Sequence, residues 1–271
     1  MKNNNITIYH DLFHLLRTVV NPCISIMGMI KGIRIQKNNT ISFVYFHSIE
    51  KKYASQFERL ILSLKEKYTF ISMSDAIKLL NQNNSLSNAY LSLSFDDGFH
   101  DNYEAARILK KHSVPATFFI VTEWLNGNTH KLHPVFRSYI RNAKPLSWDE
   151  VILISRMGFS IGSHSSRHYR FADLSDEESF AELCKSKNDI ENRIESSVDS
   201  FSFPYGRVVD YKKSDVDLIF KAGYRYFVTT ELHQYMHKID DRIGIGRFGM
   251  EPYINRRSFE YLLHGLLQTY R

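Results

Sequence analysis

Cysteine is scarce in this chain, and its scarcity excludes one class of site and one class of scaffold. The 271 residues include two cysteines, Cys23 and Cys184, which lie far apart and form no Cys-x-x-Cys pair. A zinc site built on clustered cysteines needs such pairs, so it is excluded. A disulfide framework is unnecessary, because a chain of this length buries a sufficient core without one. The two thiols fit a protein of a reducing compartment.

Long apolar runs are also lacking. The best run, from Thr18 to Ile30, is interrupted by Asn21 and Pro22 and lies between basic residues. It is too short to span a bilayer, and no small-residue cleavage motif follows it. We therefore expect a cytoplasmic protein without a cleavable signal peptide. The run from Thr18 to Ile30 is expected to be a buried or amphipathic segment. Peripheral membrane contact through residues 11–34 and an uncleaved signal anchor are the alternatives.

Charge of one sign is not concentrated anywhere along the sequence. The chain has 35 Lys and Arg against 29 Asp and Glu, a net charge of +6, and the basic residues are scattered in ones and twos. Without a basic stripe or a known motif, no nucleic-acid partner is expected. No low-complexity tract and no Pro/Gly/Ser-rich linker divides the chain. We therefore predict one main domain over residues 39–271, preceded by an N-terminal extension over residues 1–38.

The sequence does contain a regular alternation of β-type and α-type segments. Short runs of aromatic and β-branched residues predict strands, and apolar residues at helical spacing predict helices. The expected strands are 41–49, 89–95, 116–121, 159–164, 197–204 and 224–230, and the expected helices are 54–68, 74–80, 102–112, 147–158, 176–195 and 213–222. Ser74 and Ser147 are the predicted N-caps of two of these helices. The βα order predicts an α/β fold with a parallel sheet, either barrel-like or doubly wound.

Three clusters each lie at the C-terminal end of a predicted strand, which is where α/β folds build their sites. The first is Asp96-Asp97-Gly98. Two carboxylates in one pocket repel unless a cation or a proton separates them, so one of them could bind a metal while the other stays a base. A solvated turn is the alternative reading of this cluster.

The second cluster is His164 and His168, which are four residues apart. If the segment is one helical turn, both imidazoles lie on the same face, which is a metal-chelating geometry. Two imidazoles suit zinc and its transition-metal neighbours. Two unrelated histidines on a polar face are the alternative.

The third cluster is Phe203-Pro204-Tyr205-Gly206, at the end of an aromatic strand. Glycine permits an unusual backbone angle and the close approach of a ligand, and aromatic rings suit the faces of sugars. A core strand that closes in a turn is the alternative. Taken together, one carboxylate and two imidazoles leave a metal position open, the pattern of a catalytic zinc site, and a second carboxylate can act as general base. That combination predicts hydrolysis.

In this order and spacing, the clusters resemble the polysaccharide deacetylase family, carbohydrate esterase family 4. The resemblance runs over roughly residues 41–231 and includes the segments SLSFDDGFHDNYEAARILKKHSVPATFFI, LSWDEV, GFSIGSHSSRH and FSFPYG. It implies a distorted (β/α) barrel with fewer than eight repeats, with parallel strands inside and helices outside. It also implies metal-dependent removal of acetyl groups from sugars.

The resemblance assigns roles to individual residues. Asp96 corresponds to the general base, and the backbone N–H of Tyr205 to a donor for the oxyanion. The implied metal ligands are Asp97, His164 and His168. The implied substrate contacts are Phe203, Pro204, Tyr205 and Gly206. The expected cofactor is one divalent transition metal, zinc in the first place, with cobalt, nickel and iron as alternatives.

The chain departs from the family's pattern at three motifs. The residue that usually orients the base is missing from the third motif, and Arg167 and Arg247 are the candidate replacements. The Asp-and-Trp fourth motif has no clear match. The Leu-x-His fifth motif, which supplies the general acid, would fall near 245–248, where there is no histidine. The candidates for the acid are His47, His233 and His237. His47 is favoured, because the family's first strand often ends in Tyr-His near the site.

The expected function is removal of an N-acetyl group from an amino sugar of a glycan or a glycan precursor in surface-polysaccharide biosynthesis. The expected partner is an acylated amino sugar, linked to a nucleotide or a lipid, because the sequence has no recognisable secretion signal. One alternative is a deformylase that acts on an N-formyl amino sugar. Another is a carbohydrate-binding pseudoenzyme without turnover, which the departures from the family's pattern would explain.

Overall fold

The computed structural model describes residues 40–82, 86–231, 237–239 and 242–265 of the chain. Two compact units are distinguished, Asn39–Pro252 and a unit that joins residues 1–38 to 253–271. The predictions for residues 1–38, including membrane contact through residues 11–34, lie outside the described residues and stay predictions. Among the described helices, none is both long and apolar enough to cross a membrane.

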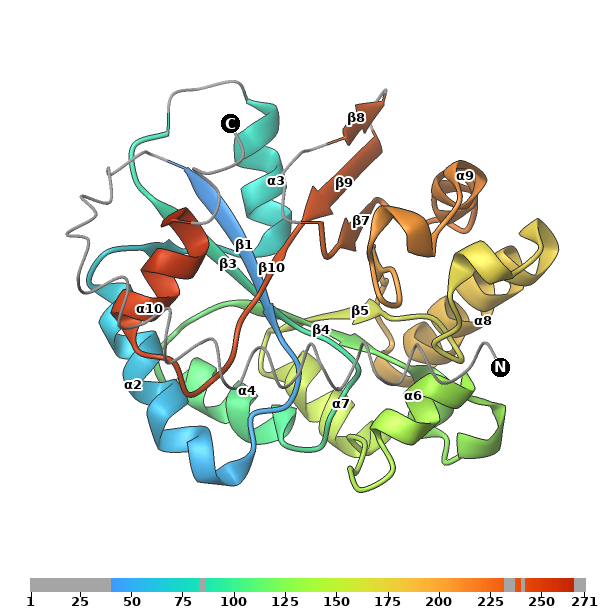
Figure 1. Cartoon of the computed structure of the whole chain (residues 1–271), viewed down its shortest axis with the longest axis horizontal. Coiled ribbons are helices and arrows are strands. Elements are labelled where there is room, and N and C mark those ends of the chain that lie inside the picture. The colour runs from blue at the N-terminus through green and yellow to red at the C-terminus, as the bar shows by residue number, and fades with distance from the viewer. Residues whose placement is uncertain (1–39, 83–85, 232–236, 240–241, 266–271) are drawn as a thin grey trace. The chain divides into compact units, whose positions relative to one another are not determined.

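A nearly closed barrel of eight parallel strands forms the centre of the first unit (Figure 1). Its strands, in spatial order, are β10 (Phe248–Gly249), β1 (Ile41–Phe46), β3 (Tyr90–Phe95), β4 (Ala116–Ile120), β5 (Ser160–Ser163), β6 (Ser200–Ser202), β7 (Tyr226–Thr229) and β9 (Arg242–Gly246). Two short strands stand beside the barrel: β2 (Thr69–Phe70) pairs parallel with β3, and β8 (His237–Ile239) pairs antiparallel with β9. The predicted distorted (β/α) barrel is confirmed.

One interrupted strand segment at the end of the domain closes the barrel. β9 pairs in parallel with β7, with Gly246 opposite Thr229, whereas β10 pairs in parallel with β1, with Gly249 opposite Tyr45. Arg247 lies between these two strands, and its N–H donates to Thr229 O at 3.1 Å. The residue pattern alone predicted no strand here, although the fifth motif of the family that the chain resembles is a strand motif that would fall near 245–248. This closure places the buried side chain of Arg247 in the site described below.

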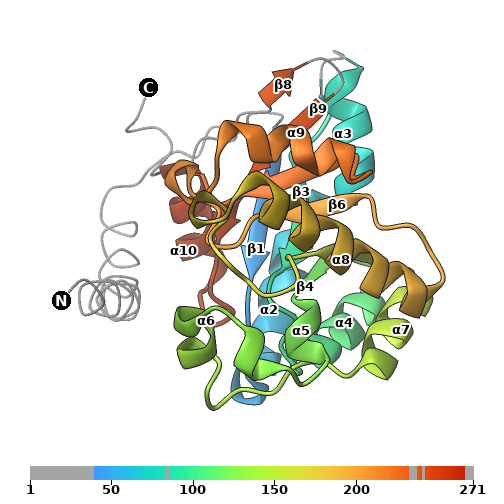
Figure 2. The ribbon, with the colours of Figure 1, turned by 90° about the vertical axis from the view of Figure 1, so that its right-hand side faces the viewer.

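Helices cover the outside of the barrel (Figure 2). They are α2 (Ala54–Lys65), α3 (Met73–Asn81), α4 (Asn102–Lys111), α5 (Thr122–Leu125), α6 (Pro134–Tyr139), α7 (Trp148–Arg156), α8 (Asp176–Ile194) and α9 (Lys213–Lys221). The second unit, described by itself, contains α10 (Arg256–Glu260), which is capped by the side chain of Asn255. On α2 the apolar stripe is buried as its helical spacing requires, and it consists of Phe57, Leu60, Ile61 and Leu64.

Two helix starts show how local side-chain chemistry sets element bounds. Ser147 forms a capping box with Glu150 at the start of α7, as its position predicts. The prediction of Ser74 as the cap of α3 is wrong. Ser72 is the N-cap, and its hydroxyl accepts the Asp75 N–H at 3.1 Å. The cap is Ser72 because its backbone is still extended, whereas the helix has begun at Met73.

The core beneath the site is aromatic. Phe95 of β3 stacks on Phe118 of β4 with ring centroids 4.8 Å apart, and Phe46 of β1 stacks on Phe95 at 5.7 Å. The edge of Phe57 on α2 meets Phe46 at 5.5 Å, so the helix is fixed against the strands. Each of these four rings is essentially inaccessible to solvent. Their packing fixes the carboxyl ends of β1 and β3, from which the site is built.

Candidate metal centre and active site

The Asp96-Asp97-Gly98 cluster turns sharply at the end of β3. Asp97 and Gly98 both have positive φ, 74° and 84°, and the N–H of Asp96 donates to Phe46 O at 2.9 Å. Both carboxylates are buried, each with 2% of its surface exposed. The turn sends the two side chains to different partners in one pocket: Asp97 faces two histidines, and Asp96 faces an arginine.

The His164 to His168 segment brings its two imidazoles together without a helix. It is an irregular loop after β5 in which Ser165 and His168 have positive φ, 66° and 57°. The convergence expected of the two rings is therefore found, but the helical turn that was to produce it is not. Each Nε2 lies 3.4 Å from Oδ1 of Asp97, and the two ring centroids are 4.9 Å apart.

The three side chains fit a divalent metal. One ligand atom from each of Asp97, His164 and His168 lies within 4.8 Å of the other two, and all three residues are buried. Oδ1 of Asp97 is buried and accepts no hydrogen bond from a described residue. Ligand atoms held at about 2.0–2.1 Å around one tetrahedral zinc are about 3.4 Å apart, which matches the distances from Oδ1 to both Nε2 atoms. Two nitrogens and one oxygen also suit cobalt, nickel or iron.

Hydrogen bonding and burial prepare these ligands. Nδ1 of His164 lies 2.8 Å from Ser202 O and donates to it, which leaves Nε2 to face Asp97. Burial lowers the pKa of His168 to about 4, so its imidazole is neutral near pH 7. Burial would raise the pKa of Asp97, but the two histidines outweigh it and hold that pKa well below its usual range. A neutral imidazole and an ionised carboxylate are the forms that bind metal.

Asp96 is held by Arg247 rather than by an arginine of the third motif. Nη1 and Nη2 of Arg247 donate to Oδ1 and Oδ2 of Asp96 at 2.8 Å and 2.7 Å. The same guanidinium donates to the hydroxyls of Ser94 and Ser202 at 2.9 Å and 2.8 Å. Burial would raise the pKa of Asp96, but Arg247, followed by His164, lowers it. The carboxylate is therefore ionised and fixed in orientation, as a general base requires.

Arg167, the other candidate partner of the base, serves the ligand loop instead. Its Nε donates to Oε1 of Glu182 at 2.5 Å, and its backbone N–H donates to Oε2 at 2.8 Å. Oε2 also accepts the N–H of Ser166 at 3.1 Å. Glu182 is a buried residue of α8, so this helix fixes the loop between the two histidines. The sequence analysis missed Glu182, because nothing in the helix pattern distinguishes it from solvated glutamates.

The long connection between β4 and α7 supplies a wall of the site. Phe136 of α6 stacks on His168 with ring centroids 4.0 Å apart and an interplanar angle of 17°. Just before α6, the N–H of His133 donates to Arg167 O at 3.0 Å, and Nδ1 of His133 is hydrogen-bonded to the hydroxyl of Tyr205 at 3.0 Å. The sequence analysis missed this wall. Pro134 at the first position of α6 was the available signal.

The third cluster places its residues in two environments. Tyr205 and Gly206 form a left-handed turn, with φ 64° and 73°, that Thr230 fixes by hydrogen bonds to both carbonyls, at 2.8 Å and 2.9 Å. Pro204 is buried beside them, whereas Phe203 packs into the aromatic core and stacks on Tyr211 at 4.2 Å. The Phe203 ring therefore supports the turn from below and does not line the site.

His47 is the candidate acid that the structure places near the ligands. It follows β1, its Nε2 lies 3.9 Å from Oδ2 of Asp97, and its side chain is 36% exposed. The edge of its ring meets Tyr45 at 5.3 Å. His233 lies outside the described residues, and for His237 only the backbone, in β8, is described.

Comparisons with known proteins agree with this geometry. The family model for polysaccharide deacetylase matches residues 83–227. The protein YxkH of Bacillus subtilis (strain 168), named as a polysaccharide deacetylase, is 26% identical over 206 residues, which are 73% of this chain and 67% of that protein.

Two solved structures share the fold. The Streptococcus pyogenes deacetylase PplD in complex with acetate has a TM-score of 0.65 at 19% identity, covering 85% of this chain and 98% of that one. A de-N-acetylase from Aggregatibacter actinomycetemcomitans has a TM-score of 0.63 at 20% identity, covering 82% of this chain and 99% of that one.

Proposed function

Since this chain belongs to the polysaccharide deacetylase family, whose members are metal-dependent deacetylases, we propose that it removes the N-acetyl group from an amino sugar of a surface glycan or of its precursor. One observation carries the proposal. The buried trio of Asp97, His164 and His168 lies beside a second carboxylate, Asp96, which Arg247 keeps ionised. Metal ligands and a separate base in one pocket are what amide hydrolysis requires.

Each polar group of the site has a task in this reaction. A divalent cation bound to the trio, zinc in our proposal, would act as a Lewis acid on the acyl carbonyl. Asp96 is the general base that accepts a proton from the attacking water. His47, at the exposed side of the ligands, is the proposed acid that donates a proton to the departing amine.

The backbone N–H of Tyr205 is the proposed donor to the oxyanion. It makes no hydrogen bond to any described residue, and the left-handed turn that presents it is fixed by Thr230. A fixed donor of this kind costs no reorganisation when charge develops on the carbonyl oxygen. Gly206 and Pro204 complete the proposed substrate contacts of this turn.

The test is the release of acetate from acetylated amino sugars, presented free, as oligomers and linked to a nucleotide or a lipid. We expect metal-dependent acetate release, and we expect Asp96→Asn to lower kcat about 10²–10⁴-fold, the usual contribution of a general base. Asp149→Asn, which alters an exposed carboxylate on α7, is the matched control and should leave kcat unchanged.

The same panel separates the competing functions. Release of formate from N-formyl sugars without release of acetate would make the protein a deformylase. Sugar binding without release of either acid, at full metal loading, would make it a pseudoenzyme and overturn the proposal. A nucleotide- or lipid-linked precursor met in the cytoplasm is the substrate form we propose, and its ranking against free oligomers in the panel tests that choice.

A further inference from the structure

The wall of the site formed between α5 and α7 has an unusual charge pattern. From Trp124 to Trp148 the sequence contains no aspartate or glutamate. It contains four cations, all exposed: Lys131, Arg137, Arg141 and Lys144. All 29 acidic residues of the chain lie outside this segment. The segment therefore carries a net charge of +4, which favours an anion.

Three of the four cations have no acidic partner within the described part of the chain. Lys131 lies 3.7 Å from Oε1 of Glu123, so part of its charge is compensated. Arg137 donates to the carbonyl of His130 at 3.4 Å and forms no ion pair with a described carboxylate. Arg141 and Lys144 likewise form none. Their charge is available to a ligand.

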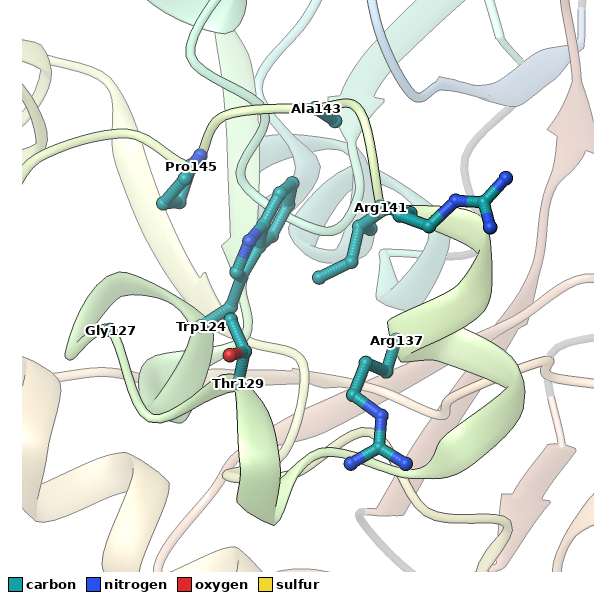
Figure 3. A pocket seen from close by; sticks show the side chains of 8 residues that line it. Trp124, Gly127, Thr129, Arg137, Arg141, Ala143 and Pro145 are labelled. Carbon is teal, nitrogen blue, oxygen red and sulfur yellow. The ribbon is translucent and has the colours of Figure 1, made fainter.

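Two of these cations border a cavity of about 320 Å³ in the same wall (Figure 3). Arg137 lies on α6 and Arg141 in the turn after it. Their side chains extend away from the indole of Trp124, so the guanidinium groups lie at the rim of the cavity (Figure 3). The rest of the lining is largely apolar and includes Ile140, Ala143 and Pro145. The volume is at the lower end of the range for small-molecule pockets. It is large enough for a phosphate or pyrophosphate group.

Contacts between aromatic side chains connect the cavity to the metal centre. Phe136 lies between them: one contact of its ring is the stack on His168 at 4.0 Å, and another is an edge contact with Trp124 at 5.6 Å. At the far end of the wall, the N–H of Leu146 donates at 2.8 Å to the carbonyl of Gly98, the residue that follows the two aspartates in the sequence. Phe136 therefore contacts both a metal ligand and Trp124, a residue that lines the cavity.

We propose that this cavity is an anion subsite that holds the phosphate or pyrophosphate group attached to the acylated amino sugar. The guanidinium groups of Arg137 and Arg141 bind the phosphate oxygens, since a planar fork of donors matches their geometry. This inference rests on the proposed function, because it names the chemical form of the substrate of the same site. A nucleotide and a lipid carrier share this phosphate chemistry.

The subsite is tested by binding and by substrate preference. Calorimetry should show that inorganic pyrophosphate binds the metal-loaded protein, with an affinity that falls as salt rises. In Arg137→Ala and Arg141→Ala the dissociation constant should rise about tenfold, the lower range for hydrogen bonds to a charged group. The ratio of kcat/KM for a phosphorylated over a neutral acetylated amino sugar should fall by a similar factor. Arg156→Ala, which removes an exposed arginine of α7, is the control and should change neither.

The outcomes separate the subsite from the proposed function. Equal kcat/KM for phosphorylated and neutral sugars, or pyrophosphate affinity that both variants retain, would overturn the subsite while acetate release upholds the function. Pyrophosphate binding that depends on both arginines, without acetate release from any sugar, would uphold the subsite as an anion site and overturn the function. Comparing a nucleoside-diphosphate sugar with a sugar on a detergent-solubilised lipid pyrophosphate identifies the carrier.

Discussion

Arg247 and Asp96 lie 151 residues apart in the sequence and face each other in a two-pronged ion pair inside the barrel, with N–O distances of 2.8 Å and 2.7 Å. The arginine is wholly buried and lies between β9 and β10, where the barrel closes. The same residue therefore marks the closure of the fold and orients the proposed base.

Removing this arginine should change the pH dependence of the reaction. Arg247 lowers the pKa of Asp96 against the effect of burial, so that pKa rises in Arg247→Met. The base works only when ionised. The acid limb of the kcat/KM profile should therefore move to higher pH, and kcat should fall. An acid limb at the wild-type position in the folded variant would show that Asp96 is not the group whose ionisation limits the reaction.

The same substitution should destabilise the fold. Breaking a buried ion pair by removing one partner costs about 3–5 kcal/mol, because the other charge is left uncompensated. Urea unfolding of Arg247→Met should show such a loss, and the double variant Arg247→Met/Asp96→Asn should recover part of it. Arg247→Lys keeps the charge and provides a folded variant for the pH profile if the methionine variant unfolds.

Glu182 should control metal affinity without touching the metal. Its carboxylate accepts the N–H groups of Ser166 and Arg167 between the two histidine ligands. In Glu182→Gln an amide replaces one acceptor oxygen, and the loop loses a bond that sets the ring positions. Metal affinity, measured by chelator competition, should weaken about 10–100-fold. Glu177→Gln, an exposed position on the same helix, is the matched control, and an equal affinity in both variants would refute the positioning role.

We expect position 206 not to tolerate even the methyl side chain of alanine in place of Gly206. A Cβ there would lie 2.8 Å from the backbone nitrogen and 2.9 Å from Cγ2 of Thr230, at a φ of 73°. Gly206→Ala should cost about 1–3 kcal/mol in unfolding free energy and lower kcat, because the Tyr205 N–H is displaced.

Gly158→Ala is the control that distinguishes backbone strain from the steric clash expected at Gly206. Gly158 also has positive φ, 92°, but a Cβ there would meet nothing within 4 Å. Its alanine variant should carry only the backbone penalty and keep the wild-type kcat. If Gly206→Ala behaves like Gly158→Ala, then the contact with Thr230 does not hold the turn.

The sequence predicted the barrel and the metal trio for a physical reason. Parallel strands place their carboxyl ends at one edge, so the two aspartates and the two histidines could be grouped from their positions at the ends of two predicted strands. The resemblance to the family then singled out the barrel and Asp97 as the ligand. The pattern could not show how the histidines converge. Positive φ at Ser165 and His168 replaces the expected helical turn, and such a loop leaves no periodic signal.

Other parts of the site depend on contacts that no local pattern encodes. Whether Arg167 or Arg247 meets Asp96 depends on where the barrel closes, through pairing between β10 and β1. Glu182 differs from neighbouring glutamates only in the loop that α8 covers. The sequence does not distinguish Phe136 from an ordinary core residue. Only the structure shows that its ring stacks on His168. These are tertiary choices, and sequence spacing alone does not determine them.

Metal stoichiometry tests the central claim most directly. We would measure metal per chain by elemental analysis in protein purified without chelator, beside Asp97→Ala, His164→Ala and His168→Ala. His100→Ala, which removes an exposed histidine outside the trio, is the control. The account predicts about one divalent transition metal per chain in the wild type and the control, and its loss in the three variants. Wild-type protein that binds no metal after incubation with zinc or cobalt, or variants that retain it, would contradict the account.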